Sequence, residues 1–236
     1  VDVAHLQVGE LVGPDFEWRP GSADSVTGQL LLSWTRTPER PELSEEWDGR
    51  AQTGHAGRAQ WRHSSPRIDW TAIYREVSED FRADNGYIPQ AGFREGYGEA
   101  GYTFRPESGL LRRVRPFAIY DRHLDFDEDL LLQQMSAGAV MDALLTSSVE
   151  LSYSYDRILA GTEVLPRQQL VYTVSVSPSM TLSRIELSGS AGQQIDFENA
   201  RTGTGPDIAL GLTVRPTPHL ELVLNESLRW LDVRSG

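Results

Sequence analysis

Apolar and polar residues alternate with a period of two along most of the chain. In residues 168–192, QQLVYTVSVSPSMTLSRIELSGSAG, the apolar positions before and after a Pro-containing turn are Leu170, Tyr172, Val174, Val176, Ile185 and Leu187. Such alternation is typical of β-strands with one apolar and one polar face. The apolar face contacts either a protein core or lipid, and periodicity alone does not distinguish the two, because a β-sandwich alternates in the same way.

The pattern predicts about twelve strands. They lie near residues 3–19, 26–36, 50–62, 67–79, 93–105, 110–122, 129–141, 145–156, 167–177, 181–193, 205–215 and 218–231. Most are longer than the ~5–6 residues typical of soluble proteins and suit tilted membrane strands of ~9–11 residues with short extensions. One stretch, LLLQQMSAGAVMDALL (130–145), also has helical propensity, so a helix is the alternative there.

The predicted connections alternate between short and long. Short turns fall at 20–25, 64–67, 106–109, near Asp142, at 177–180 and at 216–219, and longer polar connections fall at 37–49, 79–92, 122–129, 156–166 and 194–205. Short turns on one rim and long loops on the other are typical of outer-membrane barrels, where the short turns are periplasmic. This layout puts both chain ends on the extracellular rim, whereas a complete bacterial barrel has an even strand number and normally both termini in the periplasm, so at least one further strand is expected on each side, roughly fourteen or more in all. We therefore expect one domain, 1–236, that is part of a larger barrel.

Aromatic residues favour lipid over a core. Phe16, Trp18, Trp61, Trp70, Tyr102 and Phe104 lie beside the short turns, and Trp34, Tyr74, Tyr153, Tyr155 and Trp230 lie near the opposite strand ends. Two such bands match the aromatic girdles at the two membrane interfaces; aromatic caps on a sandwich core are the alternative. No run approaches the ~18 apolar residues of a transmembrane helix.

Composition excludes several function classes. The net charge of −12 argues against nucleic acid as a partner, because phosphate binding needs a basic surface. The chain has no cysteine, so it has no disulfide framework and no thiolate metal site. The Ser, His and Asp residues are not spaced in a way that indicates a catalytic triad. We therefore expect no enzymatic activity and no cofactor.

Charged residues on the polar faces are the candidate functional residues. Neighbouring strands carry opposite charges within pairing reach, and in a barrel these side chains would line the lumen: Arg58, Arg62, Asp69, Arg75, Glu95, Glu99, Arg184 and Glu186. They either filter solutes by charge or form a structural ladder that fills the interior.

The acidic stretch 121–129 is a weak candidate for a Ca²⁺ site through Asp125, Asp127 and Asp129. It lacks the Gly and the distal Glu of an EF-hand loop.

Two features oppose a lipid-facing interpretation. Glu226 shares a face with Leu222, Leu224, Leu228 and Trp230, and a carboxylate facing lipid is unfavourable away from the interface. Arg113 and Arg115 likewise share a face with Phe117 and Ile119. Their nearness to the turn at 106–109 would let them snorkel to the headgroups.

The stretch DFRADNGYIPQAGFREGYGEAGYTFRP (80–106) resembles the C-terminal barrel region of large bacterial outer-membrane proteins that carry an N-terminal carbohydrate-binding-like domain of the family-nine type. The matching residues are Asp80-Phe81, Gly86-Tyr87-Ile88 and Phe104-Arg105-Pro106, whereas Gln90 stands where Arg is common. The resemblance implies a barrel fold and a location in the bacterial outer membrane. It implies no reaction, because the family has no established one.

Together these observations predict an all-β, antiparallel up-and-down transmembrane β-barrel in a Gram-negative envelope. Its expected role is that of a porin-like channel or a membrane platform for other envelope or surface components. Its expected partners are outer-membrane lipid and either further barrel strands or partner envelope proteins. The alternatives are a soluble β-sandwich adhesin or carbohydrate-binding module and, less favoured, a hydrolase borne on the barrel.

Overall fold

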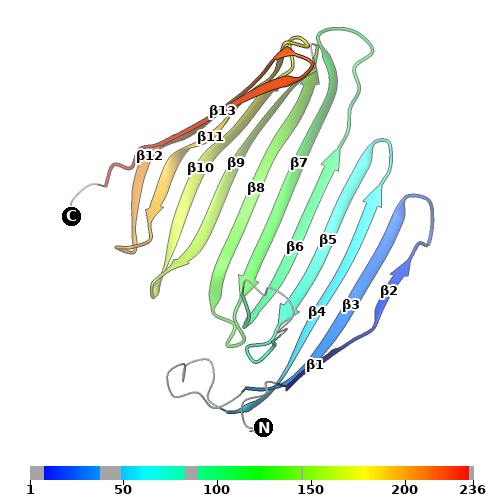
Figure 1. The fold of residues 1–236 in the computed structure, drawn as a ribbon, viewed down its shortest axis with the longest axis vertical. Helices are drawn as coiled ribbons and strands as arrows, with labels where there is room; N and C mark the ends of the chain where they lie inside the picture. Colours follow the sequence, from blue (N-terminus) through cyan, green and yellow to red (C-terminus); the bar gives the residue numbers. More distant parts are fainter. Residues whose placement is uncertain (1–7, 38–48, 83–89, 145, 234–236) are drawn as a thin grey trace. The chain divides into compact units, whose positions relative to one another are not determined.

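The computed structural model describes residues 8–37, 49–82, 90–144 and 146–233, and within these ranges the regular structure is entirely β. Thirteen strands form one antiparallel up-and-down sheet (Figure 1). The strands follow one another in chain order from β1 to β13, except that both β1 and β2 pair with β3. None of the described segments forms a helix long and apolar enough to cross a membrane.

The strands are long over most of the chain. They are β1 Val8–Val12, β2 Asp15–Trp18, β3 Asp24–Arg36, β4 Ala51–Ser64, β5 Ile68–Val77, β6 Phe93–Tyr102, β7 Leu111–Leu124, β8 Leu130–Ala143, β9 Ser147–Ala160, β10 Glu163–Val176, β11 Leu182–Asp196, β12 Arg201–Thr217 and β13 Leu220–Arg229. Each of the predicted segments from 26–36 onward coincides with one of the strands from β3 to β13. The helical alternative for 130–145 is wrong, because β8 occupies Leu130–Ala143.

The first predicted segment, 3–19, is not one strand. Val8–Val12 and Asp15–Trp18 are separate short strands on the same edge of β3. Gly13 and Pro14 interrupt them: a Cβ on Gly13 would lie 1.7 Å from the Leu30 carbonyl oxygen, and Pro14 accepts a bond from the Leu30 amide at 3.0 Å but has no N–H to donate in return. Residues 3–7 lie outside the described residues.

The predicted alternation of short and long connections is wrong in the second half of the chain. The connection assigned to 156–166 is a turn at 161–162, where Gly161 has a φ of 64°. The connections assigned to 122–129 and 194–205 shrink to 125–129 and 197–200. Polar residues such as Asp156 and Gln194 look like loop residues in the sequence, but they lie on the polar face of strands that continue past them.

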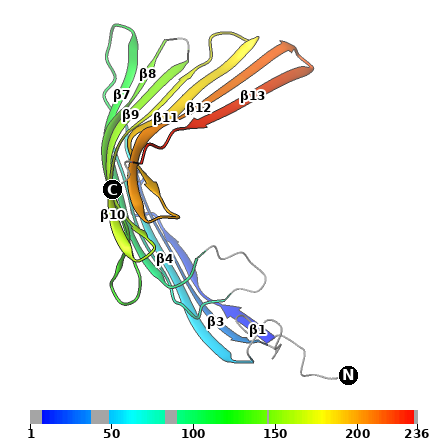
Figure 2. The ribbon, with the colours of Figure 1, turned by 90° about the vertical axis from the view of Figure 1, so that its left-hand side faces the viewer.

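The chain divides into two compact units. The first comprises 1–63, 71–97 and 123–129, and the second comprises 64–70, 98–122 and 130–236. Within the second unit, β8 to β13 lie side by side in a curved single layer (Figure 2). The strand order ends at β1 and β13, which do not pair with each other in the described part of the chain. The described strands therefore do not close into a ring.

The burial of alternate residues is inverted relative to a water-soluble protein. Along β9, Leu151 is 42% exposed and Tyr153 is 52% exposed, whereas Ser152 between them is 9% exposed and Ser154 and Asp156 beyond them are 2% and 1% exposed. β3 in the first unit repeats this arrangement: Leu32 and Trp34 are exposed, and Ser33 and Thr35 are buried. On β3 and β9 the apolar side chains are therefore exposed, and the polar side chains that alternate with them are buried.

Candidate functional site on the polar face

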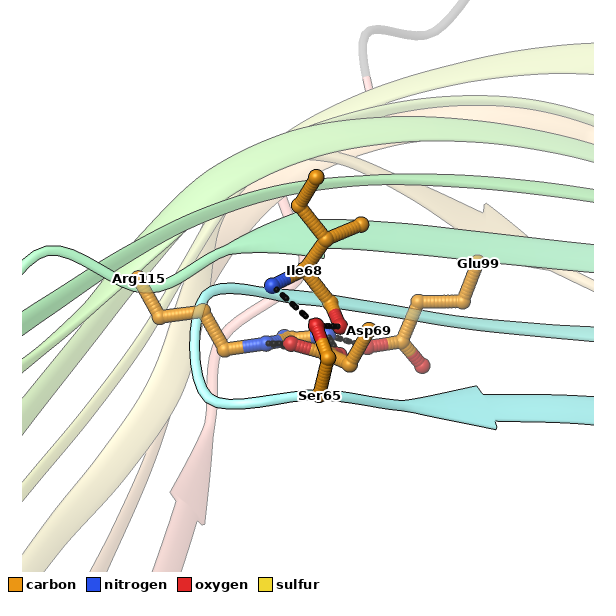
Figure 3. Close-up of polar contacts among 5 residues, drawn as sticks. All are labelled: Ser65, Ile68, Asp69, Glu99 and Arg115. Atoms are coloured by element: carbon orange, nitrogen blue, oxygen red, sulfur yellow. Dashed lines mark hydrogen bonds and ion pairs between the residues drawn. The ribbon is translucent and has the colours of Figure 1, made fainter. Parts of the chain in front are cut away.

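A three-residue charge cluster lies on the polar face of β5, β6 and β7 (Figure 3). The Arg115 guanidinium donates from Nε to both carboxylate oxygens of Asp69 at 3.0 Å and from Nη2 to Glu99 at 2.7 Å. All three side chains are partly buried, and that of Arg115 is the most enclosed of the three. Charge-assisted bonds of this kind are stronger than neutral ones, and a planar guanidinium fits two acceptors at once.

Local structure holds the cluster in place. The turn before Asp69 is closed by Ser65, whose hydroxyl donates to the Ile68 carbonyl at 2.7 Å and accepts from its amide at 3.1 Å (Figure 3). Opposite, a Cβ on Gly101 would lie 2.5 Å from the Arg115 guanidinium, so the absence of a side chain at Gly101 makes room for that group. The Phe117 ring lies 5.7 Å from the Arg115 Cζ, within the range of a cation–π contact.

Two further hydrogen-bonded groups, here together called the polar belt, lie on the polar face of the same unit, one across β8, β9 and β10 and the other across β10, β11 and β13. The Asp156 carboxylate accepts bonds from Ser154 at 2.5 Å and from Arg167 at 2.9 Å and 2.7 Å. Further along, Ser190 accepts bonds from Gln169 and Gln194, and Gln194 in turn accepts from Arg229 at 3.4 Å. Gln134 donates to Ser154 at 3.3 Å and so extends the belt to β8.

The predicted site residues of the first unit also lie on a polar face. The Arg75 guanidinium contacts the Glu95 carboxylate at 2.5 Å and sits 4.9 Å above the Phe93 ring. Arg58 and Arg62 are exposed and lie opposite Gln29 and Ser25 of β3, and Arg58 donates to Gln60 at 2.8 Å. The two pairs Asp69–Arg115 and Arg75–Glu95 thus lie in different units, and the structure does not gather all eight predicted residues into one cluster.

The remaining predicted pair, Arg184 and Glu186, forms an exposed ion pair on β11. The register places Glu186 opposite Ser175 on one side and Gly211 on the other, so the pair shares the face of the polar belt. A lumen-lining role for the eight predicted residues stays a prediction.

The two features that opposed a lipid-facing sheet have different outcomes. Arg113 and Arg115 do not face outward: Arg113 donates to Asp142 at 2.7 Å, and Arg115 belongs to the cluster above. Here the apolar Phe117 lies among charged residues on the enclosed face, where it is buried. Glu226 remains on the apolar face, opposite Leu210 of β12.

The acidic stretch of the first unit forms a tight turn. Asp125 accepts bonds from the backbone amides of Asp127 and Asp129 at 3.0 and 2.8 Å through one carboxylate oxygen. This Asx-type turn gives Asp125 a structural role. Ca²⁺ binding by these three residues stays a prediction.

Sequence reasoning missed one cluster in the first unit. Glu76 accepts bonds from His55 at 2.7 Å, from Tyr74 at 2.7 Å and from Arg94 at 3.1 Å. The Phe126 ring lies 4.4 Å from the Arg94 guanidinium and so covers the cluster. Tyr74 and Glu76 are two residues apart and so share one face of the strand. This spacing is the one local feature of the sequence that could have indicated the cluster.

Comparison with known proteins gives no relative from which a function could be transferred. No protein-family model, no curated protein and no solved structure matches this chain.

Proposed function

We propose that this chain forms part of the wall of an outer-membrane β-barrel, with its apolar face in lipid and its polar face toward a lumen. The observation that carries this proposal is the inverted burial along β9, where exposed Leu151 and Tyr153 alternate with buried Ser152, Ser154 and Asp156. Lipid is the environment in which an exposed apolar face is favourable, and a transmembrane barrel has apolar residues outside and polar ones inside.

The buried residues argue against the β-sandwich alternative. Among the described residues the buried hydrophobic side chains are Val77, Phe81, Phe93, Phe117, Ala160 and Ile195. A larger group of buried residues is polar or charged, as Ser33, Thr35, Asp156, Gln169 and Gln194 illustrate. A soluble sandwich instead buries the apolar faces of two sheets against each other, and such a core would include the leucines that are exposed here.

The aromatic residues of the first unit have the spacing that a bilayer requires. Trp18 and Trp61 both lie opposite Val26 near one end of β3, and Trp34 lies near its other end. All three tryptophans are exposed. The eight residue-to-residue steps from Val26 to Trp34 span about 27 Å along a strand, comparable with the ~25 Å apolar band of outer-membrane barrels.

The open edges imply further strands. All ten residues of β13 are exposed, and β12 is its partner within the described sheet. An unpaired edge leaves backbone N–H and C=O groups without partners, which lipid does not tolerate. We infer that additional strands, from a longer chain or from a partner envelope protein, close the barrel in the membrane.

The role of the barrel is that of a channel or of a platform for other envelope components. The Asp69–Glu99–Arg115 cluster favours a polar lumen with fixed charges, which would bias permeation by solute charge. A hydrolase borne on the barrel is the weaker alternative, and the absence of enzymatic activity stays a prediction.

Membrane insertion is tested first. The purified chain should require detergent, run at a heat-dependent position on gels, and co-float with lipid vesicles. A folded monomer in plain buffer would refute the barrel.

Conductance of the reconstituted protein in planar bilayers then separates the two roles. A channel gives ion-selective conductance steps, and Arg115→Ser should shift their selectivity toward cations. A platform gives no conductance steps.

A further inference from the structure

In the second unit, strands β10 and β11 pair over only part of their length and then diverge. The point of divergence, at Gln169–Gly192, is here called the fork. The ladder between these strands ends at Gln169–Gly192, although β10 continues along β9 to Glu163 and β11 continues along β12 to Asp196. The diverging strands are visible at the ends of β10 and β11 in Figure 1. Within the described residues, the side chain of Gln193 replaces the missing ladder bond, because its Oε1 accepts from the Gln168 amide at 2.9 Å.

A groove of about 560 Å³ lies at this fork. Its apolar part consists of Leu170, Ala191 and Pro206, and Tyr153 borders it. Gly192 and Gly205 line the groove with backbone, because a Cβ there would lie 2.3 Å and 2.0 Å from the Gln168 and Trp230 carbonyl oxygens, so neither position can carry a side chain. The volume falls within the range of small-molecule sites, and the groove is continuous with the apolar face assigned to lipid.

Polar groups line the groove beside Tyr153. The Gln168 side-chain oxygen accepts a bond from the Tyr153 hydroxyl at 2.9 Å, and the Gln193 side-chain oxygen accepts from the Gln168 backbone amide. The side-chain oxygens of Gln168 and Gln193 thus accept bonds, whereas their side-chain Nε2 groups donate none within the described residues and are available to a ligand. Two such donors beside an apolar trough complement an amphiphile whose acceptor oxygens lie next to an alkyl chain.

We propose that the groove binds one membrane phospholipid, with an acyl chain along Leu170, Ala191 and Pro206 and with its ester or phosphate oxygens at Gln168 and Gln193. This inference rests on the proposed function, because the apolar face must lie in a bilayer for a phospholipid to reach it. The fork gives the lipid a fixed place, whereas lipid elsewhere on the apolar face exchanges freely.

Lipid retention tests the proposal. The full chain is extracted from vesicles of phosphatidylethanolamine and phosphatidylglycerol into mild detergent, and bound lipid is counted by native mass spectrometry. The wild type should retain one phospholipid. Ala191→Phe fills the groove and should lower retention at least about tenfold, because the chain methylenes lose their buried contact. The matched control Leu187→Phe lies on the same face of the same strand outside the groove and should retain lipid as the wild type does.

The outcomes separate this proposal from the proposed function. Vesicle insertion without a retained lipid, or equal retention by the wild type and Ala191→Phe, would overturn the groove and leave the barrel intact. A chain that stays soluble without detergent would overturn both. If Ala191→Phe loses the heat-dependent gel shift, the paired change Gln168→Leu with Gln193→Leu replaces it: loss of retention supports the groove, and unchanged retention refutes it.

Discussion

Strands β9 and β13 have the same alternating sequence pattern but different exposure. In β9 the polar residues Ser152, Ser154 and Asp156 are buried, whereas every residue of β13 is exposed. β9 has partners on both sides, β8 and β10, and β13 pairs with β12 alone in the described sheet. The difference teaches that the polar face becomes enclosed where a strand has side-chain partners on both sides, and that β13, with one partner strand in the described sheet, has no such enclosure.

The largest expected effect comes from the buried ion pair of β9 and β10. Asp156→Ala leaves the Arg167 guanidinium without its carboxylate on the enclosed face. Removing one member of a buried pair costs about 3–5 kcal/mol of unfolding free energy. Urea titration in micelles, followed by tryptophan fluorescence, measures it. The double change Asp156→Ala with Arg167→Ala should recover part of the loss; a cost below about 1 kcal/mol for the single change would contradict an enclosed belt.

A charge on the apolar face of β9 should cost somewhat less. If Leu151 faces lipid as proposed, Leu151→Arg places a guanidinium in the bilayer, which costs about 2–4 kcal/mol near the midplane. The measurement is the same titration with the protein folded in vesicles. Glu150→Arg is the matched control, because Glu150 is the neighbouring residue, lies on the opposite face and is exposed. Equal small effects of both changes would indicate that water, not lipid, contacts Leu151.

The corresponding ion pair at β13 should contribute little. Arg215 and Glu221 contact each other at 2.5 Å, but both side chains are largely exposed. Glu221→Ala should therefore change the unfolding free energy by about 0–1 kcal/mol, because exposed pairs are screened by solvent. The comparison with Asp156→Ala is the direct test of the contrast between β13 and β9. A large effect of Glu221→Ala in the isolated chain would show that β13 is enclosed after all.

The smallest effect is a pH dependence at the turn between β11 and β12. Asp196 lies at the end of β11, beyond the part of the strand needed to cross a bilayer, and the Arg201 guanidinium and Asn199 amide that donate to it hold its pKa below the ordinary value. A carboxyl with a lowered folded-state pKa stabilises the fold above its unfolded pKa of about 4, and this contribution is lost as the pH falls through the folded pKa. Asp196→Asn should remove that part of the pH dependence, as urea midpoints at pH 7 and in acid would measure; identical acid sensitivity of both proteins would contradict it.

Local sequence was enough to place most strands. Alternation of apolar and polar residues is a property of a single extended chain, so the segments from 26–36 to 218–231 could be read from the sequence. The alternation also indicated which residues share a face of the sheet, and it placed Asp69 and Glu99 among the candidate lumen-lining residues. It failed where polar face residues resembled a loop, as at Asp156, and where Gly13 and Pro14 divided a strand.

The tertiary structure decided which side chains meet and which are enclosed. Arg115 and Asp69 are 46 residues apart, and whether they pair depends on the register of strands that the sequence pattern does not specify. The sequence pattern puts Arg115 on one face with Phe117 and Ile119 and so suggests a lipid-facing position, whereas the structure pairs it with Asp69 and Glu99. The sequence by itself determined the strands and their two faces, since alternation is local. Only the assembled sheet decided the ion pairs, the buried polar belt and the fork at Gln169–Gly192, because these depend on neighbours distant in sequence.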